Sequence, residues 1–211
     1  MVLIINCGSS KTKYIEEIVD EFCDFETIPF FELTEEKAIT AKALIFSGAP
    51  LLITEIDMYP YIEHINWLKE YQNPILGICF GHQLIGLLYG AFGSRMKENR
   101  DWLEIEVIKE SLLFDKLPSI FEVMEDHCES ISIPEGFKLL ASSDECINEA
   151  MQHKEKKIYG LQFHPEVSGN FGRVIIENFL NCMNNPPTIK NLCFRIICLF
   201  SSLEILIKLN H

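Results

Sequence analysis

The sequence has few basic residues and contains no run of lysine or arginine. Its 18 lysine and arginine residues are outnumbered by 31 aspartate and glutamate residues, which gives a formal net charge of −13. An acidic surface repels phosphate groups, so we expect neither nucleic acid nor an anionic membrane as a partner. A glycine-rich phosphate loop is also absent from the sequence. We therefore expect no nucleotide and no other cofactor on this chain.

The eight cysteines include no C-x-x-C pair. Zinc-binding cysteines usually come in such closely spaced pairs, so no metal site is expected. The N-terminus also lacks the basic segment and the long apolar stretch of a secretory signal peptide. The sequence therefore predicts a cytoplasmic protein in which most thiols are small core residues.

The length of 211 residues suffices for one domain with a sizeable core and a short extension. Hydrophobic residues make up 48% and charged residues 23%, which excludes a disordered chain or a coiled coil. The sequence Asn-Asn-Pro-Pro at residues 184–187 would stop a helix, and the composition changes there. We predict a domain over residues 1–184 and an apolar C-terminal tail over residues 185–211. Charged residues interrupt the tail, which is short for a membrane span.

Short apolar runs alternate with helical periodicity along the first half of the chain. Strands are predicted at residues 2–6, 25–31, 43–47 and 74–78, and helices at residues 12–22, 61–71 and 82–89. Later in the chain, antiparallel strands are predicted at residues 103–108, 121–124 and 137–141, a buried strand at 158–163 and a closing helix at 173–182. This order predicts an α/β fold with a mostly parallel central sheet, helices on both faces and a few added antiparallel strands.

A G-x-C-x-G pattern, Gly77-Ile78-Cys79-Phe80-Gly81, lies between a predicted buried strand and a predicted helix. This is the setting of a nucleophile elbow with cysteine in place of serine. The glycines allow a sharp turn, and the N-terminus of the following helix favours a negatively charged thiolate. The N–H of Phe80 can then point at a developing oxyanion. Taken alone, the pattern also fits a buried thiol beside a tight turn.

His164 and Glu166 directly follow the strand predicted at residues 158–163. Strand ends in a parallel sheet are where sites are built. A carboxylate two residues from the imidazole can accept its N–H, fix its tautomer and stabilise its charged form. With Cys79, this pair would complete a Cys-His-Glu triad, whereas alone it also fits a solvated surface turn.

Three segments together resemble the class I, triad-type glutamine amidotransferases. They are Ser-Gly-Ala-Pro at residues 47–50, Pro-Ile-Leu-Gly-Ile-Cys-Phe-Gly-His-Gln at residues 74–83 and Tyr-Gly-Leu-Gln-Phe-His-Pro-Glu-Val at residues 159–167. Their order and spacing fit that family, and the resemblance covers about residues 1–184. Residues 141–143, 149–151 and 158–160 are most similar to the glutaminase domains of GMP synthetases. The resemblance implies the flavodoxin-like fold of the class I amidotransferases.

The resemblance also implies a role for each site residue. Cys79 would attack the side-chain amide of glutamine, His164 would act as base and acid, and Glu166 would orient His164. The backbone N–H groups of Ala49 and Phe80 would form the oxyanion hole. The other substrate-binding residues that the resemblance implies are Gly48, Gln83, Asp126 and His127. The ammonia released would pass to a synthetase subunit.

Ala49 stands where the family usually has glycine, which restricts the backbone of the oxyanion loop. Two other interpretations remain open. A free-standing hydrolase of γ-glutamyl amides would keep the triad and change the substrate. A catalytically silent module would bind a partner or a small ligand instead. Glutaminase activity without a partner would favour the free-standing hydrolase over the ammonia-supplying subunit.

Overall fold

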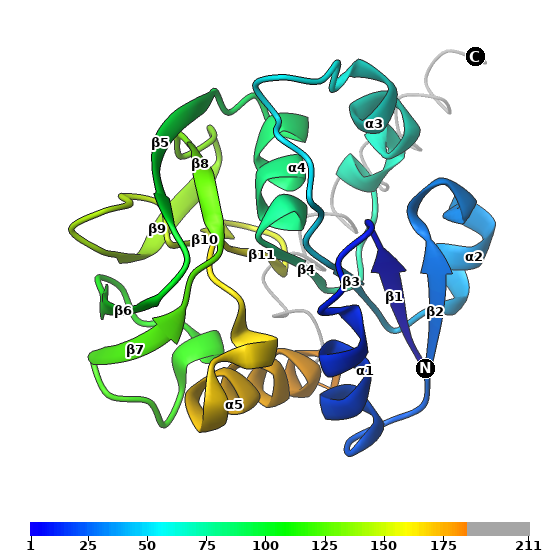
Figure 1. Ribbon diagram of the computed structural model, residues 1–211. Coiled ribbons are helices and arrows are strands. Elements are labelled where there is room, and N and C mark those ends of the chain that lie inside the picture. The colour runs from blue at the N-terminus through cyan, green and yellow to red at the C-terminus, as the bar shows by residue number, and fades with distance from the viewer. Residues whose placement is uncertain (185–211) are drawn as a thin grey trace, which may run out of the picture.

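Residues 1–184, described in a computed structural model, fold around one large mixed sheet (Figure 1). The apolar tail predicted for residues 185–211 lies outside the described residues. The parallel strands are β1 (Val2–Asn6), β2 (Phe25–Pro29), β3 (Ala43–Phe46), β4 (Ile75–Ile78) and β11 (Ile158–Leu161). The antiparallel strands are β6 (Trp102–Val107), β7 (Ile120–Met124), β9 (Phe137–Ser142) and β10 (Ala150–His153). The strand order β2-β1-β3-β4-β11-β10-β9-β6-β7 confirms a parallel centre with antiparallel strands added at one side.

Helices cover both faces of this sheet, because its central strands are apolar on both sides. Val2 and Ile4 of β1 pack with α1 (Thr12–Asp20) and α5 (Gly169–Asn181). Leu3 and Ile5 face the opposite way, toward α2 (Glu35–Thr40), α3 (Tyr59–His64) and α4 (Phe80–Leu88). Figure 1 shows α1 and α5 below the sheet and α3 and α4 above it. Among residues 1–184, no helix combines the length and the hydrophobicity needed to cross a bilayer.

Some elements differ from the predicted ones. The helix expected at residues 61–71 is split into α3 and a 3-10 turn at Asn66–Lys69, because the backbone leaves the helical conformation at Ile65. The strand expected at residues 25–31 ends at Pro29, which has no N–H to donate, and Phe30–Glu32 form a 3-10 turn.

Four elements were not predicted from the sequence. They are α2, β10, and the antiparallel ribbon of β5 (Gly93–Asn99) and β8 (His127–Ile131). β5 is mostly exposed and polar, so its sequence lacks the alternation that marks a half-buried strand. The ribbon packs against α4 and carries residues that line the pocket described below.

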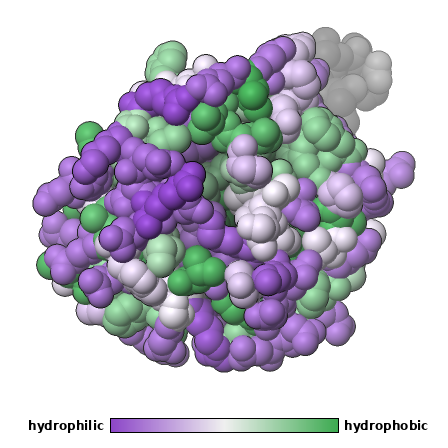
Figure 2. Space-filling view, in the orientation of Figure 1, coloured by the Kyte–Doolittle hydropathy of each residue, from purple (hydrophilic) through white to green (hydrophobic). Residues whose placement is uncertain are grey.

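The surface and the thiols agree in part with the sequence analysis. Figure 2 shows a mostly hydrophilic face with scattered hydrophobic patches. Of the six cysteines within residues 1–184, Cys79, Cys146 and Cys182 are buried and the other three are half-buried. The core position predicted for most thiols therefore holds for half of those described.

Asn178 of α5 forms hydrogen bonds that connect the antiparallel side of the protein to this helix, and its substitution tests their contribution to stability. Its buried amide donates hydrogen bonds to the carbonyl oxygens of Leu113 and Asp115, at 3.1 and 2.8 Å. We expect Asn178→Ala to lower the free energy of unfolding by about 1–3 kcal/mol, because the buried carbonyl of Leu113 and the partly buried carbonyl of Asp115 lose their donor. Urea denaturation measures this loss.

Asn181, which is exposed on the same helix, supplies the matched control. Asn181→Ala should change stability by less than about 0.5 kcal/mol. Equal effects of the two substitutions would show that the Asn178 hydrogen bonds do not fasten the two layers.

Candidate active site

Cys79 lies at the junction of β4 and α4 in a backbone conformation that is rare for a residue with a side chain, with φ of 51° and ψ of −107°. Such strain persists only where the surrounding structure enforces it. A Cβ atom on Gly77 would lie 2.4 Å from the carbonyl oxygen of Gly81, and one on Gly81 would lie 2.5 Å from that of Phe46. Only glycine fits at either position, which explains the G-x-C-x-G pattern. The predicted strand–turn–helix arrangement around Cys79 is present.

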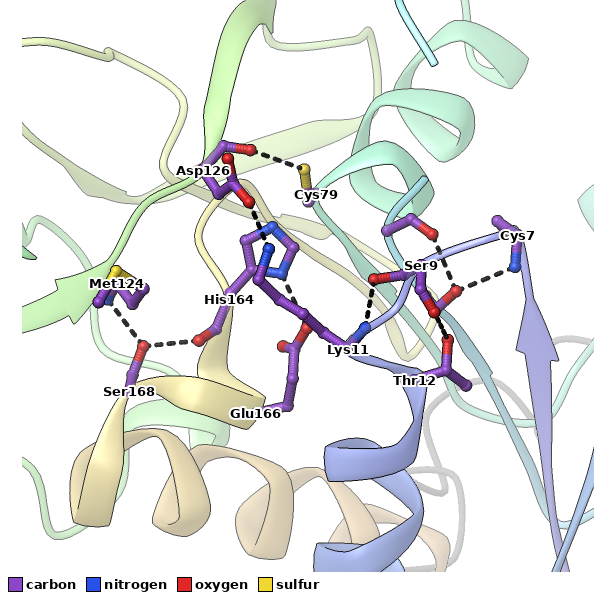
Figure 3. A network of polar contacts seen from close by, with 12 residues as sticks. Cys7, Ser9, Lys11, Thr12, Cys79, Met124, Asp126, His164, Glu166 and Ser168 are labelled. Carbon is purple, nitrogen blue, oxygen red and sulfur yellow. Dashed lines mark hydrogen bonds and ion pairs between the residues drawn. The ribbon is translucent and has the colours of Figure 1, made fainter. Parts of the chain in front are cut away.

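Figure 3 shows Cys79 on one side of the His164 ring, with its sulfur directed at the backbone oxygen of Asp126, and Glu166 on the opposite side of that ring. The sulfur lies 3.9 Å from the backbone carbonyl oxygen of Asp126 and 3.9 Å from the side-chain nitrogen of Gln162. Only 6% of Cys79 is exposed. The thiol is therefore enclosed, with polar groups around it.

His164 is held between Cys79 and Glu166. Its Nδ1 is 2.8 Å from Oε1 of Glu166, and Cys79 lies close enough for its charge to act on the ring. Because a carboxylate accepts the Nδ1 proton, Nε2 is the nitrogen left for Cys79. Burial alone would lower the pKa of His164, but the charge and hydrogen bond of Cys79, together with Glu166, raise it to about 10. The predicted triad residues are thus brought together in one buried cluster.

Ser168 fixes the backbone of His164, a role that the sequence analysis missed. Its hydroxyl donates to the carbonyl oxygen of His164 at 2.6 Å and accepts from the N–H of Met124 at 2.9 Å. The N–H of His164 in turn donates to the carbonyl oxygen of Met124 at 2.9 Å. These bonds tie the loop that follows β11 to the end of β7 (Figure 3).

A cavity of about 540 Å³ opens in front of Cys79 and His164. Its walls come from the loops after β1 and β3, from β5, and from the connection of β7 to β8. The predicted site residues that line it are Ala49, Cys79, Gln83, Asp126, His127 and His164. Gly48 lies against Cys79 and His164, since a Cβ atom there would be 3.1 Å from Cε1 of His164 and 3.6 Å from Cβ of Cys79. Glu166, which contacts the other side of the His164 ring, does not line the cavity.

Gln83 and Glu129 hold one wall of this cavity in place. The Gln83 amide donates to the backbone carbonyl oxygen of Glu129 at 3.0 Å and to the side-chain oxygen of Gln162 at 3.2 Å. The Glu129 carboxylate accepts from the N–H groups of Ile53 and Thr54, at 2.6 and 3.2 Å. Glu129 and Gln162 were not predicted as site residues, although each lies two positions from a predicted one in the sequence.

Asp126 lies at the mouth of the cavity. Its carboxylate pairs with Lys11, a cation that the sequence analysis did not identify, and lies 3.2 Å from Nε of Arg100. Burial would raise the pKa of Asp126, but the hydrogen bond and charge of Lys11, with the charges of His164 and Arg100, hold it below its usual range.

His127 is part of the wall rather than the mouth. Its Nδ1 lies 2.9 Å from the carbonyl oxygen of Glu129, and its Nε2 lies 2.9 Å from Oε2 of Glu125. Both ring nitrogens therefore face protein atoms.

The N–H groups of Ala49 and Phe80 donate no hydrogen bond to any acceptor within residues 1–184. Phe80 is the first residue of α4, so its N–H belongs to the free donors of that helix end. Ala49 lines the cavity. Free donors beside a thiol, an imidazole and a carboxylate are the parts that nucleophilic hydrolysis of an amide requires.

Comparison with known proteins identifies relatives along almost all of the described chain. The family described as glutamine amidotransferase class-I matches residues 3–182. A subunit of the glutamine-hydrolyzing GMP synthase of Pyrococcus furiosus is 44% identical over 150 residues, covering 70% of this chain and 78% of that protein. The corresponding subunit of Methanococcus maripaludis is 38% identical over 186 residues, covering 85% of this chain and 95% of that protein.

A solved structure shows the same fold. The crystal structure of a Thermoplasma acidophilum protein assigned as a subunit of GMP synthase superposes with a TM-score of 0.78 and 29% identity. The match covers 87% of this chain and 94% of that one. The α/β fold built here from strand order and packing is therefore that of these amidotransferases.

The raised pKa of His164 predicts how the reactivity of Cys79 depends on pH. The ring keeps its positive charge from pH 6.5, where an ordinary histidine loses it, up to about pH 10. That charge stabilises a thiolate, which is the reactive form of cysteine. We expect alkylation of Cys79 by iodoacetamide to change less than about threefold between about pH 6.5 and 8.5, whereas free cysteine should accelerate about 50-fold.

Mass spectrometry of the Cys79 peptide measures the rate. In His164→Asn the profile should become that of an ordinary thiol, because the neighbouring positive charge is gone. A wild-type profile that already follows free cysteine would contradict the charged pair.

Proposed function

This chain belongs to the class I glutamine amidotransferase family, and we propose that it hydrolyses the side-chain amide of glutamine with a Cys79-His164-Glu166 triad and supplies the ammonia to a synthetase subunit. The observation that carries the proposal is that buried Cys79 and His164 both lie beside Gly48 and line one cavity, with Glu166 2.8 Å from the His164 ring. The relatives named as subunits of GMP synthase favour an acceptor that makes GMP.

In the first half of the reaction, the Cys79 sulfur forms a bond to the amide carbon of glutamine. The carbonyl electron pair moves to oxygen, which the N–H groups of Ala49 and Phe80 stabilise as an oxyanion. When the carbonyl re-forms, the C–N bond breaks and His164 donates its proton to the leaving nitrogen. Ammonia departs and a glutamyl thioester remains on Cys79.

In the second half, His164 has become neutral and acts as a base toward water. The water oxygen bonds to the thioester carbon, and the same two N–H groups stabilise the oxyanion again. Collapse breaks the carbon–sulfur bond and releases glutamate. Throughout, Glu166 accepts a hydrogen bond from the Nδ1–H of His164, which keeps Nε2 directed at the reacting atoms.

The triad proposal is tested by replacing its members one at a time. We expect Cys79→Ser to lower kcat for glutamate release by at least about 10⁴-fold, because the nucleophile is lost. Glu166→Gln should lower kcat by about 10²- to 10⁴-fold, because the amide no longer fixes the His164 tautomer. Glutamate release by the purified variants measures both effects.

Cys23→Ser is the matched control, since Cys23 is a half-buried thiol in the apolar core and not in the cavity. Its kcat should equal that of the wild type. Substantial glutaminase activity in Cys79→Ser, with the circular dichroism spectrum unchanged, would show that another group is the nucleophile.

The alanine at position 49 leads us to expect that the isolated chain releases glutamate slowly. Its Cβ atom limits the backbone of the oxyanion loop, and one misplaced oxyanion donor costs roughly 100- to 1,000-fold in rate. We expect glutamate release to rise by about that factor when the ammonia-accepting synthetase of the same organism is added. We also expect Ala49→Gly to raise the rate of the isolated chain.

Steady-state glutamate release, with and without the synthetase, decides among the alternatives. A fast rate that mixing leaves unchanged would favour a free-standing γ-glutamyl amide hydrolase. No glutamate release under either condition would favour a silent binding module.

A further inference from the structure

Three titratable side chains meet inside the protein at the wall of the cavity. They are Glu125, which follows β7, His127 at the start of β8, and Glu149, which precedes β10. Their nearest ligand atoms all lie within 4.8 Å of one another. Both glutamates are completely inaccessible to solvent. Carboxylates at such positions need a compensating positive charge.

The protein supplies few donors to these carboxylates. Ser143 donates to Oε1 of Glu149 at 2.7 Å. The other Glu149 oxygen and both Glu125 oxygens lack a well-aligned donor among residues 1–184, unless the two carboxyl groups share a proton. The unpartnered oxygens are therefore available to a ligand.

The orientation of His127 points to the kind of ligand. Its Nδ1 faces the carbonyl oxygen of Glu129, which can only accept, so Nδ1 carries a proton, and in the neutral ring Nε2 then presents a lone pair. That lone pair lies 2.9 Å from Oε2 of Glu125, which is also an acceptor. If each of these two atoms bound the same ion at about 2.1 Å, a separation of about 3 Å between them would correspond to a ligand–ion–ligand angle near 90°. Metal-bound histidines commonly donate their other N–H to a carbonyl in this way.

We propose that Glu125, His127 and Glu149 bind one divalent metal ion. Two carboxylates and a neutral imidazole carry a charge of −2, which a divalent cation cancels. Carboxylate oxygen and imidazole nitrogen together suit ions such as Zn²⁺ and Mn²⁺. The other titratable groups facing the cluster are His82, from α4, and Cys146. The absence of C-x-x-C pairs concerns thiolate sites and does not bear on this one.

The ion would be structural rather than catalytic. The carbonyl oxygen of Glu129 accepts from both His127 and Gln83, so an ion on His127 would also steady the cavity wall that includes Gln83. It would do so without contacting Cys79, and metal binding can therefore be tested apart from glutamine hydrolysis.

The test uses the full chain, stripped with a chelator and then incubated with Zn²⁺ or Mn²⁺. Mn²⁺ is included because the thiols of the chain prefer Zn²⁺. After gel filtration, elemental analysis should find one ion per chain. At a metal concentration about 100-fold above the dissociation constant, the unfolding temperature should rise by about 5–10 °C.

Glu149→Gln keeps the shape of the side chain and its bond from Ser143 but removes one ligand charge. It should lose the bound ion and the temperature shift. Glu145→Gln, at an exposed position in the same loop, is the matched control and should keep both. Glu125→Gln is the second variant if Glu149→Gln does not fold.

Two results would overturn the proposal. In one, the wild-type chain retains no ion and shows no temperature shift with either metal. A shared proton would then hold the carboxyl pair, and Glu149→Gln would be at least as stable as the wild type, since its amide N–H replaces that proton. In the other, Glu149→Gln and Glu125→Gln bind metal as the wild type does, which would place the ion elsewhere.

Discussion

The strained backbone of Cys79 depends on the close approach of α4 to the ends of β3 and β4. Gly77 and Gly81 permit this approach, and the N–H of Cys79 donates to the carbonyl oxygen of Leu161 at 2.8 Å. That bond joins the elbow to β11, the strand from which the His164 loop departs. Loss of either glycine would move the thiol relative to β11, and with it the distance to the imidazole.

Strand order explains why two motifs about eighty residues apart form one site. β4 and β11 are parallel neighbours with Ile78 opposite Leu161, so Cys79 and His164 leave the sheet at the same edge. Strand β3 ends at that edge too, and the loop that follows it brings Gly48 against His164. The antiparallel side then closes the cavity with the connection from β7 to β8. The parallel strands therefore position Cys79 and His164, and the antiparallel side of the protein forms a wall of the cavity.

The strands that are apolar on both faces were predictable, and so were β6 and β7, in which buried and exposed residues alternate, whereas the polar ribbon was not. β1, β3, β4 and β11 appear as short apolar runs because helices bury both their sides. The ribbon of β5 and β8 has no such pattern, since most of β5 is exposed. Its place depends on packing against α4, a contact between distant segments that no local periodicity encodes.

The same division holds within the site. The proximity of Cys79, His164 and Glu166 was predicted because each lies in a short motif, and the structure places them together; their chemical roles stay a prediction. Lys11 and Ser168 were missed because their partners, Asp126 and Met124, are far away in the sequence. A short sequence motif identifies residues whose partners are close in the sequence. Residues whose partners are distant in the sequence are identified only by the folded structure.

Charge balance connects these missed residues to the triad. The Asp126 carboxylate interacts with the charge of His164, so an uncompensated Asp126 would hold the imidazole proton more tightly. A tightly held proton is a poor acid toward leaving ammonia. Lys11 and Arg100 both pair with Asp126 and so offset its charge at the mouth of the cavity. Glu166 remains the carboxylate that is hydrogen-bonded to the ring, and it does not line the cavity. The two cations therefore allow an acidic protein to keep a second carboxylate beside its imidazole without making that imidazole too weak an acid.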